Sequence, residues 1–174
     1  MITDDIYLDF HAGDGGDGKV SFRREKFIPR GGPDGGNGGN GGNVYVHTVS
    51  NLSVLNHFKH NTLAKAQDGG DGGAKKMFGA RGEDLIVKIP IGSTITDTET
   101  GDVWECTIVD EEFLLAKGGY GGNGNHELRS DEHKTPREAE KGRPGQKRHV
   151  HVNLAFIADI GLIGLPSAGK SSLL

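Results

Sequence analysis

Glycine recurs at every third position between Gly31 and Gly42, and this register restricts the fold more than any other feature of the chain. One register holds Gly32, Gly35, Gly38 and Gly41. The adjacent register holds Gly36, Gly39 and Gly42. The third position is filled by Asp34, Asn37, Asn40 and Asn43. A period of three fits neither the α-helix nor the β-strand, but it is the period of the polyproline II helix.

The same pattern returns in shorter form at residues 13–18, 69–82, 118–124 and 142–145. Glycine-rich tracts are commonly flexible linkers, but a linker needs neither a three-residue register nor a repeated Asp or Asn. Faces without side chains let backbones approach closely. We therefore hypothesise that the tracts pack on one another as extended helices, with buried peptide groups bonded to neighbouring tracts.

The remaining segments predict a mainly β fold: a small barrel-like or sandwich base from which the glycine tracts protrude. Alternating apolar residues predict strands, and leucines spaced three apart predict a short helical turn within residues 51–58. The predicted strands span residues 6–10, 20–22, 44–49, 85–90, 94–96, 103–109, 113–116 and 150–154.

A continuous apolar stretch at residues 157–163 is typical of a strand buried in a parallel sheet. It places a domain boundary near Ala158, so that residues 1–158 form the glycine-rich domain and residues 159–174 begin an α/β domain. The longest apolar run, residues 154–166, contains Asp159 and is too short to span a bilayer.

The apolar stretch at residues 157–163 leads into a match to the phosphate-binding loop G-x-x-x-x-G-K-[ST] at residues 164–171. Backbone N–H groups of this loop and the following helix N-terminus face phosphates. Lys170 is expected to reach the β- and γ-phosphates of a nucleotide, and Ser171 to bind Mg²⁺. No later segment carries a metal-binding Asp, a water-positioning residue or a base-reading motif. We therefore expect this chain to hold no catalytic residue, not to hydrolyse nucleotide and not to bind it tightly. The predicted nucleotide-binding residues are Gly164, Leu165, Pro166, Ser167, Ala168, Gly169, Lys170, Ser171 and Ser172.

Basic residues cluster beside the glycine tracts, although the net charge of −4 gives no global sign of nucleic-acid binding. For any single residue, a solvated surface is the simpler interpretation. Basic groups on protruding loops of an acidic body nevertheless suit a structured RNA, whose phosphates dominate affinity. The predicted RNA-binding residues are Arg23, Arg24, Lys26, Arg30, Lys75, Lys76, Arg81, Arg137, Lys141 and Arg143.

Other polar groups have weaker claims to a function. The repeated Asp and Asn could ligate Ca²⁺, but faces turned to water are the preferred interpretation. His149 and His151 share a strand face and could hold a metal, but no third ligand is evident. The single Cys106 excludes an internal disulfide framework and is expected to be inert packing.

Several segments together resemble the Obg family of GTPases. They are residues 12–18, 20–27, 31–36, 82–85 with Pro90, 118–125 and 159–164 with the phosphate loop. The resemblance implies polyproline II helices on a barrel-like base, followed by a GTPase domain that uses Mg²⁺ with GTP or GDP. It also implies a role in large ribosomal subunit assembly and stress response, with the loops reaching ribosomal RNA. Ser167 and Ser172 depart from the common Asn and Thr of the family.

Two other interpretations stay open. A freestanding glycine module could act in binding or structure without nucleotide, although the phosphate loop argues against it. An unrelated P-loop ATPase could carry a glycine-rich appendage, and a downstream base-specificity motif would decide that question. For the favoured interpretation we expect a monomer in the cytoplasm, without a membrane span.

Overall fold

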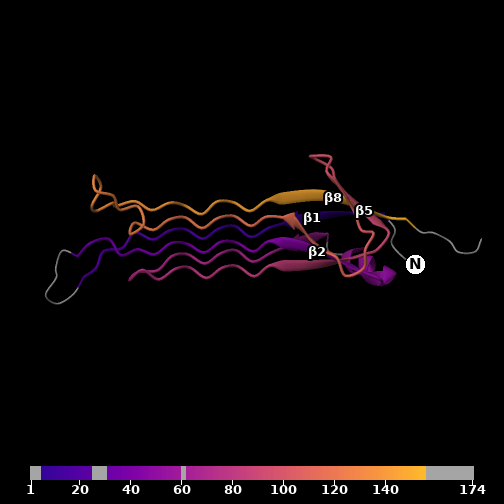
Figure 1. Ribbon diagram of the computed structural model, residues 1–174, viewed down its shortest axis with the longest axis horizontal. Helices are drawn as coiled ribbons and strands as arrows, with labels where there is room; N and C mark the ends of the chain where they lie inside the picture. The colour runs from indigo at the N-terminus through magenta and orange to yellow at the C-terminus, as the bar shows by residue number, and fades with distance from the viewer. Residues whose placement is uncertain (1–4, 25–30, 60–61, 156–174) are drawn as a thin grey trace, which may run out of the picture.

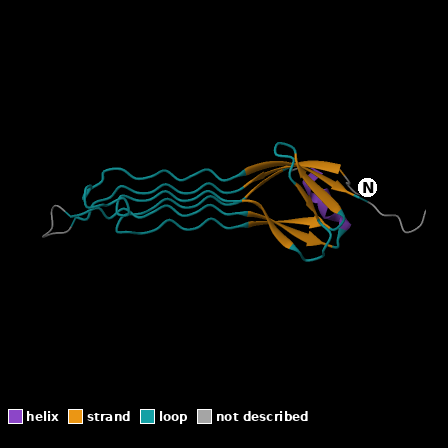
Figure 2. Ribbon diagram, turned by 45° about the horizontal axis from the view of Figure 1, so that its top comes forward, coloured by secondary structure: helices purple, strands orange, loops and turns teal. Residues whose placement is uncertain are grey.

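The computed structural model describes residues 5–24, 31–59 and 62–155. The strands gather at one end of the molecule, and the glycine tracts extend from them side by side (Figures 1 and 2). Within this part of the chain the fold is mainly β, with one 3₁₀ helix, η1 (Leu52–Lys59). The strands are β1 (Asp5–His11), β2 (Val44–Val49), β3 (Leu63–Lys65), β4 (Leu85–Pro90), β5 (Ser93–Asp97), β6 (Val103–Glu105), β7 (Glu112–Ala116) and β8 (Lys147–Leu154).

The strands form two open sheets. A five-stranded sheet has the order β3-β1-β8-β5-β6, and a three-stranded sheet has the order β4-β2-β7. Among the described strands, the pairs β1–β3 and β2–β4 are parallel, whereas the others are antiparallel. A barrel-like base was expected, but no closed barrel is found among the described residues.

The core forms where the strands alternate between buried and exposed positions. In β1, Leu8 and Phe10 are buried, and in β2, Val44 and Val46. These side chains belong to one hydrophobic cluster that draws on both sheets and on Leu55 of η1. A two-residue period turns one side of each strand inward, so the alternation in the sequence correctly marks the core.

Two local predictions differ from the structure, and one short strand was not predicted. Residues 20–22 make only an isolated bridge between Phe22 and Pro33 instead of a strand. The predicted strand at 103–109 ends at Glu105, and Ile108 and Val109 are exposed beyond it. The short strand β3 was not predicted, because its three residues are too few for a periodic signal.

Each glycine tract continues a strand. Tracts 12–19, 66–73 and 117–125 follow β1, β3 and β7 away from the sheets. Tracts 35–43, 77–84 and 139–146 return to β2, β4 and β8. We call the bundle of these six tracts the prong, and the loops that join them at its far end the tips (Figure 2).

Hydrogen bonds in the prong follow the three-residue register. The N–H groups of Gly13 and Gly16 donate to Gly42 and Gly39 of one neighbour at 2.9 and 2.8 Å. Those of Gly15 and Gly18 donate to a second neighbour, tract 139–146, at 2.9 Å each. Those of Asp14 and Asp17 donate to the carboxylates of Asp68 and Asp71 in a third, at 2.8 Å each. Successive residues of tract 12–19 therefore face three different tracts in turn.

The glycines are required where backbones meet. A Cβ atom on Gly38 would lie 1.9 Å from the carbonyl oxygen of Gly16. One on Gly39 would lie 2.0 Å from that of Ala80. Any side chain at these two positions would push backbone away from backbone, so the bundle hypothesis is supported over the linker hypothesis.

The Asp and Asn residues between the glycines have a role that the sequence analysis missed. The side-chain oxygens of Asn37, Asn40 and Asn43 accept N–H groups of tract 117–125 at 2.8–2.9 Å. Those of Asp14 and Asp17 accept N–H groups of tract 139–146 at 2.8 Å. These side chains lie at or near the surface, as expected, and they also satisfy backbone donors that have no carbonyl partner.

Candidate nucleic-acid interface

The candidate interface lies at the tips of the prong, where two hollows adjoin. The larger, of about 630 Å³, is lined by Val20, Phe22, Arg23, Arg24, Gly31, Thr135 and Arg137. The smaller, of about 360 Å³, is lined by Arg23, Arg24, Asp34, Lys75 and Lys76. Arg23 and Arg24 belong to both hollows, so the two form one continuous basic surface.

This surface joins basic residues from three separate tips. Five of the ten predicted RNA-binding residues meet there although up to 114 positions separate them in the sequence (residues 23 and 137). Among the described residues, no carboxylate forms an ion pair with Arg24, Lys75, Lys76 or Arg137. Their charges are therefore available to an anionic partner.

Asn125 fixes the tips relative to one another. Its side chain is fully buried, and Oδ1 accepts the N–H groups of Ser21 and Gly35 at 3.3 and 2.9 Å. Its Nδ2 donates to the carbonyl oxygens of Ser21 and Pro136 at 3.0 and 3.1 Å. One amide thus connects the segments that carry Arg23, Asp34 and Arg137. Sequence reasoning missed this role, and the only local signal is that Asn125 ends a glycine tract.

Asp34 joins the first tip to the second. Its N–H donates to the carbonyl oxygen of Ser21 at 2.9 Å, and its own carbonyl oxygen accepts the N–H of Lys76 at 2.6 Å. The residue is only 8% exposed, and its carboxylate Oδ1 has no hydrogen-bond partner among the described residues. Buried polar atoms normally have partners, so this oxygen is an unusual feature of the hollow.

The second tip holds its lysines in a strained backbone. Lys75 and Lys76 have φ angles of 58° and 60°. This left-handed region costs a non-glycine residue roughly 1–2 kcal/mol. Asp110 is the third described non-glycine residue with a positive φ and lies away from the hollow. Lys75 and Lys76 are adjacent and both line the smaller hollow, and such outliers cluster at functional sites.

The other predicted RNA-binding residues lie elsewhere or outside the described part. Arg81 pairs with Asp84 at 3.0 Å in the tract that returns to β4. Lys141 and Arg143 are exposed on tract 139–146 and do not line either hollow. Lys26 and Arg30 fall outside the described residues, as do the predicted nucleotide-binding residues 164–172 and the Mg²⁺ ligand Ser171.

The paired histidines of β8 bind carboxylates of β1. His149 Nδ1 lies 2.5 Å from Asp9 Oδ1, and His151 Nε2 contacts Asp5 Oδ1. The hydrogen bond to Asp9 raises the pKa of His149 above its ordinary value. Across residues 5–155, apart from the gaps, no group of three or more His, Cys, Asp or Glu side chains is placed to hold a metal. Cys106 is buried, and burial raises the pKa of its thiol to about 11, as expected for inert packing.

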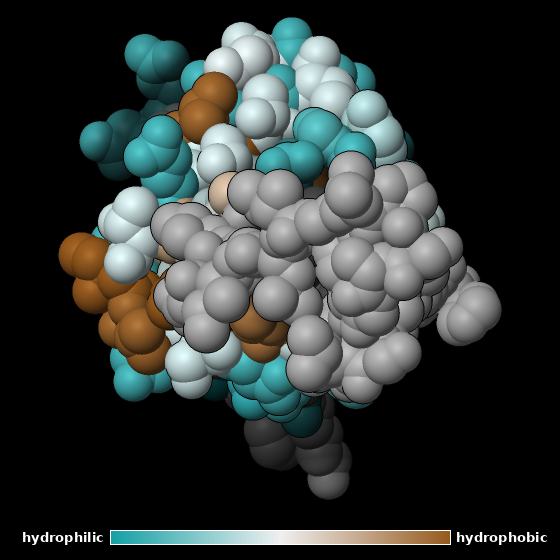
Figure 3. All heavy atoms as spheres, turned by 90° about the vertical axis from the view of Figure 1, so that its right-hand side faces the viewer, coloured by the Kyte–Doolittle hydropathy of each residue, from teal (hydrophilic) through white to brown (hydrophobic). Residues whose placement is uncertain are grey.

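The opposite end of the molecule has a different surface. Figure 3 views the sheet end, where hydrophobic residues gather at one side among hydrophilic ones. Large apolar side chains are exposed on β4, β6 and the loop that follows β6: Ile86, Val103, Ile108 and Val109. No helix of the described residues has the length and hydropathy to cross a membrane.

Comparison with known proteins decides the family. A sequence profile described as GTP1/OBG matches residues 3–156. The chain belongs to the GTP1/OBG family. Proteins named GTPase Obg match the whole chain with 44% identity in Limosilactobacillus reuteri, 46% in Nostoc sp. and 47% in Nautilia profundicola.

These GTP1/OBG relatives are longer than the present chain. The match covers 40% of the L. reuteri protein, 51% of the Nostoc protein and 49% of the N. profundicola protein. The chain therefore spans about half the length of the curated relatives that it matches. The profile covers the sheets and the prong, so the family resemblance seen in the glycine tracts is confirmed.

Proposed function

We propose that this chain is the RNA-contacting part of an Obg-type GTP-binding protein that acts in assembly of the large ribosomal subunit and in stress response. The observation that carries the proposal is the gathering of five basic residues around two adjoining hollows at the tips. Phosphate contacts by Arg and Lys dominate the affinity of proteins for nucleic acid. A prong that projects these residues can enter a cleft in folded RNA, which the acidic remainder of the chain cannot.

The nucleotide part of the proposal rests on the sequence and on the family. Residues 1–158 would form the glycine-rich domain, and residues 159–174 would begin the GTPase domain. Gly164, Gly169 and Lys170 would hold the phosphates of GTP or GDP, and Ser171 would bind Mg²⁺. The name of the relatives, GTPase Obg, supports GTP hydrolysis by the whole protein. We place that protein in the cytoplasm as part of the same proposal. The present chain alone would be inactive and monomeric.

We also propose that each glycine tract is a polyproline II helix. The rotation of hydrogen-bond partners through three neighbours in tract 12–19 supports three residues per turn. A rigid helix of this kind would hold the basic tips at a fixed distance from the sheets.

Binding to large ribosomal subunits tests the RNA contact. The double variant Arg24→Gln/Lys75→Gly removes two tip charges, and glycine at position 75 relieves left-handed strain. The control Lys88→Gln/Lys147→Gln removes two exposed charges on β4 and β8, away from both hollows. We expect the tip variant to bind roughly tenfold more weakly and with a flatter salt dependence, since each lost phosphate contact lowers the slope by about 0.7–0.9. Equal binding of the tip and control variants in co-sedimentation would refute the proposal.

A further inference from the structure

We propose that the smaller tip hollow holds one unpaired nucleotide of an RNA strand, with its phosphate against Arg24 and Lys75 and a base N–H donated to Asp34. The inference rests on the proposed RNA contact and adds to it a site that discriminates between bases. Its basis is the unusual combination of four basic residues with one buried carboxylate that has an unpartnered oxygen.

The carboxylate of Asp34 is placed to accept a hydrogen bond. Both backbone groups of Asp34 are bonded, to Ser21 and Lys76, so the residue is held in position. Its Oδ1 has no partner among the described residues. Asp34 lines the hollow, although its Oδ1 is buried in the structure. The terminal torsion of an Asp side chain is broad, so the proposal requires a rotation about Cβ–Cγ that turns a carboxylate oxygen to the hollow. A ligand that supplies an N–H group satisfies this oxygen.

The charges of the hollow select the class of ligand. An isolated divalent cation is repelled by the four Arg and Lys side chains, and an isolated phosphate gains nothing from Asp34. A nucleotide carries both required groups, an anionic phosphate and a base with N–H donors. Unpaired bases in RNA are bound in this way, with hydrogen bonds at the Watson–Crick edge and stacking on guanidinium planes.

The size and surroundings of the hollow favour a strand. Its volume of about 360 Å³ is near the lower end of small-molecule pockets, at roughly 300 Å³. The larger hollow continues from it across Arg23 and Arg24 and adds Arg137. A strand that places one nucleotide beside Asp34 can therefore place the next against the larger hollow.

The carboxylate should favour guanine and disfavour uracil. Guanine offers adjacent N1–H and N2–H donors, which a carboxylate accepts. Uracil offers a single N3–H between two carbonyl oxygens that repel a carboxylate. Hydrogen bonds to charged groups are stronger than neutral ones, so the difference should be measurable in short oligonucleotides.

Fluorescence anisotropy with the whole chain tests this inference. The probes are a short oligouridylate and the same oligonucleotide with one central guanosine. We expect the wild type to bind the guanosine probe roughly tenfold more tightly, the size expected for one charged hydrogen bond. Asp34→Asn should reduce the ratio of the two affinities toward one. A third hollow, separate from the two described above, is lined by His126, Glu127, Arg129, Ser130, Asp131 and Lys134. Asp131→Asn changes the same charge there and should leave the ratio unchanged.

The outcomes separate the inference from the proposed function. Salt-dependent binding of both probes with equal affinity, unchanged by Asp34→Asn, would overturn the inference and leave the RNA contact standing. If neither probe binds, and the tip variant binds ribosomal subunits as tightly as the control variant, both the inference and the proposed RNA contact are overturned. Free GMP and the unlabelled oligonucleotide are also compared as competitors of the guanosine probe. If GMP displaces the probe as effectively as the oligonucleotide does, the hollow binds a free nucleotide, and the proposal that it binds an RNA strand is overturned.

Discussion

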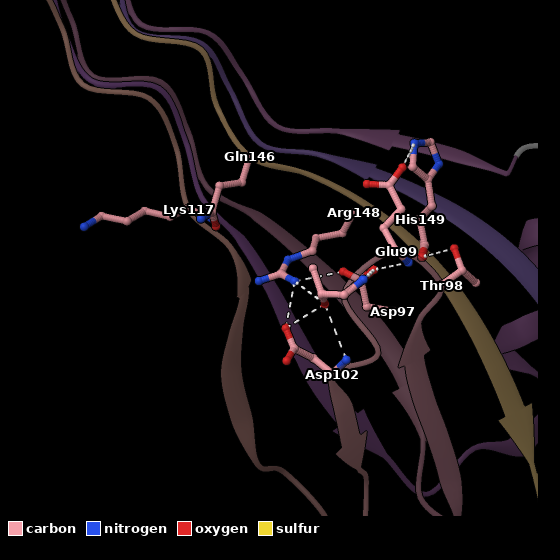
Figure 4. Close-up of polar contacts among 9 residues, drawn as sticks. Asp97, Thr98, Glu99, Asp102, Lys117, Gln146, Arg148 and His149 are labelled. Atoms are coloured by element: carbon pink, nitrogen blue, oxygen red, sulfur yellow. Dashed lines mark hydrogen bonds and ion pairs between the residues drawn. The ribbon is translucent and has the colours of Figure 1, made fainter.

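At the scale of single residues, Asp97 is a buried carboxylate of the sheets with three hydrogen-bond partners. It is 2% exposed, and its Oδ2 accepts a hydrogen bond from Arg148 Nη1 at 2.8 Å (Figure 4). Arg148 also bonds Asp102 at 3.0 Å and lies over the Trp104 ring at 5.5 Å. Burial alone would raise the pKa of Asp97. The bonds from Arg148 and from the N–H groups of Thr100 and Glu99 outweigh burial, and the pKa falls to about 2.

This shift predicts a loss of stability in acid. The pKa of Asp97 is about 2 in the folded chain, against an ordinary value of 3.8. A depressed carboxyl pKa contributes stability that is present above the unfolded pKa and is lost as the pH falls through the folded one. At about 1.4 kcal/mol per pKa unit, we expect the wild type to lose about 2 kcal/mol more than Asp97→Asn between pH 5 and pH 2. Urea denaturation at several pH values measures the free energy of unfolding of the two proteins. If this free energy falls equally with pH in the wild type and in Asp97→Asn, the prediction is contradicted.

Single residues at the tips were predictable only in part. The charges of Arg23, Arg24 and Lys75 were visible in the sequence. The roles of Asp34 and Asn125 were not, because Asn125 bonds residues 90 and 104 positions away in the chain. Such pairing leaves no local pattern.

At the scale of elements, the glycine register determines the packing of the prong. Successive residues of a tract meet different neighbours, so each face without side chains is covered by another backbone. Gly38 is enclosed in this way, whereas no atom of the described residues lies within 4 Å of a Cβ atom at Gly32. The two positions lie in the same register of one sequence stretch and differ only in their surroundings.

The pair therefore gives a matched test of the packing. Gly38→Ala places a methyl group where the Gly16 carbonyl oxygen lies, so backbone must move. Overpacking of this kind costs typically 1–3 kcal/mol, and we expect Gly38→Ala to lower the free energy of unfolding by about that amount. Gly32→Ala should change it by less than about 0.5 kcal/mol, as at open surface sites. Similar melting temperatures for Gly38→Ala and the wild type would argue that the tracts are linkers.

Elements with a strong period were predictable, and their partners were not. The alternation in β1, β2, β4, β5, β7 and β8 marked six strands correctly. The pairing of β1 with β8, at the two ends of the described chain, follows from no local signal. The two open sheets instead of a barrel are likewise set by tertiary packing, which periodicity does not encode.

At the scale of the whole molecule, the prong and the sheets share one network of hydrogen bonds. The tracts are continuous with strands of both sheets. Tract 35–43 alone bonds to tracts 12–19, 66–73 and 117–125 through Gly39, Gly36 and Gly38 among others. A tract cannot separate from the bundle without breaking bonds to several neighbours. We therefore expect the prong to be rigid and to hold its basic tips in a fixed position relative to the sheets.

Amide hydrogen exchange tests this rigidity directly. The N–H groups of Gly36, Gly39 and Gly42 donate to carbonyl oxygens of tract 66–73 at 2.8–2.9 Å. Because their opening requires the bundle to open, we expect protection factors on the order of 10³ or more, comparable to those of β2. The exposed Gly32 serves as the reference for an accessible position. If the three amides exchange within about tenfold of the rate of an unstructured chain, the tracts are flexible tethers. A flexible tether would not hold Arg23, Arg24 and Lys75 in a fixed position for insertion into an RNA cleft.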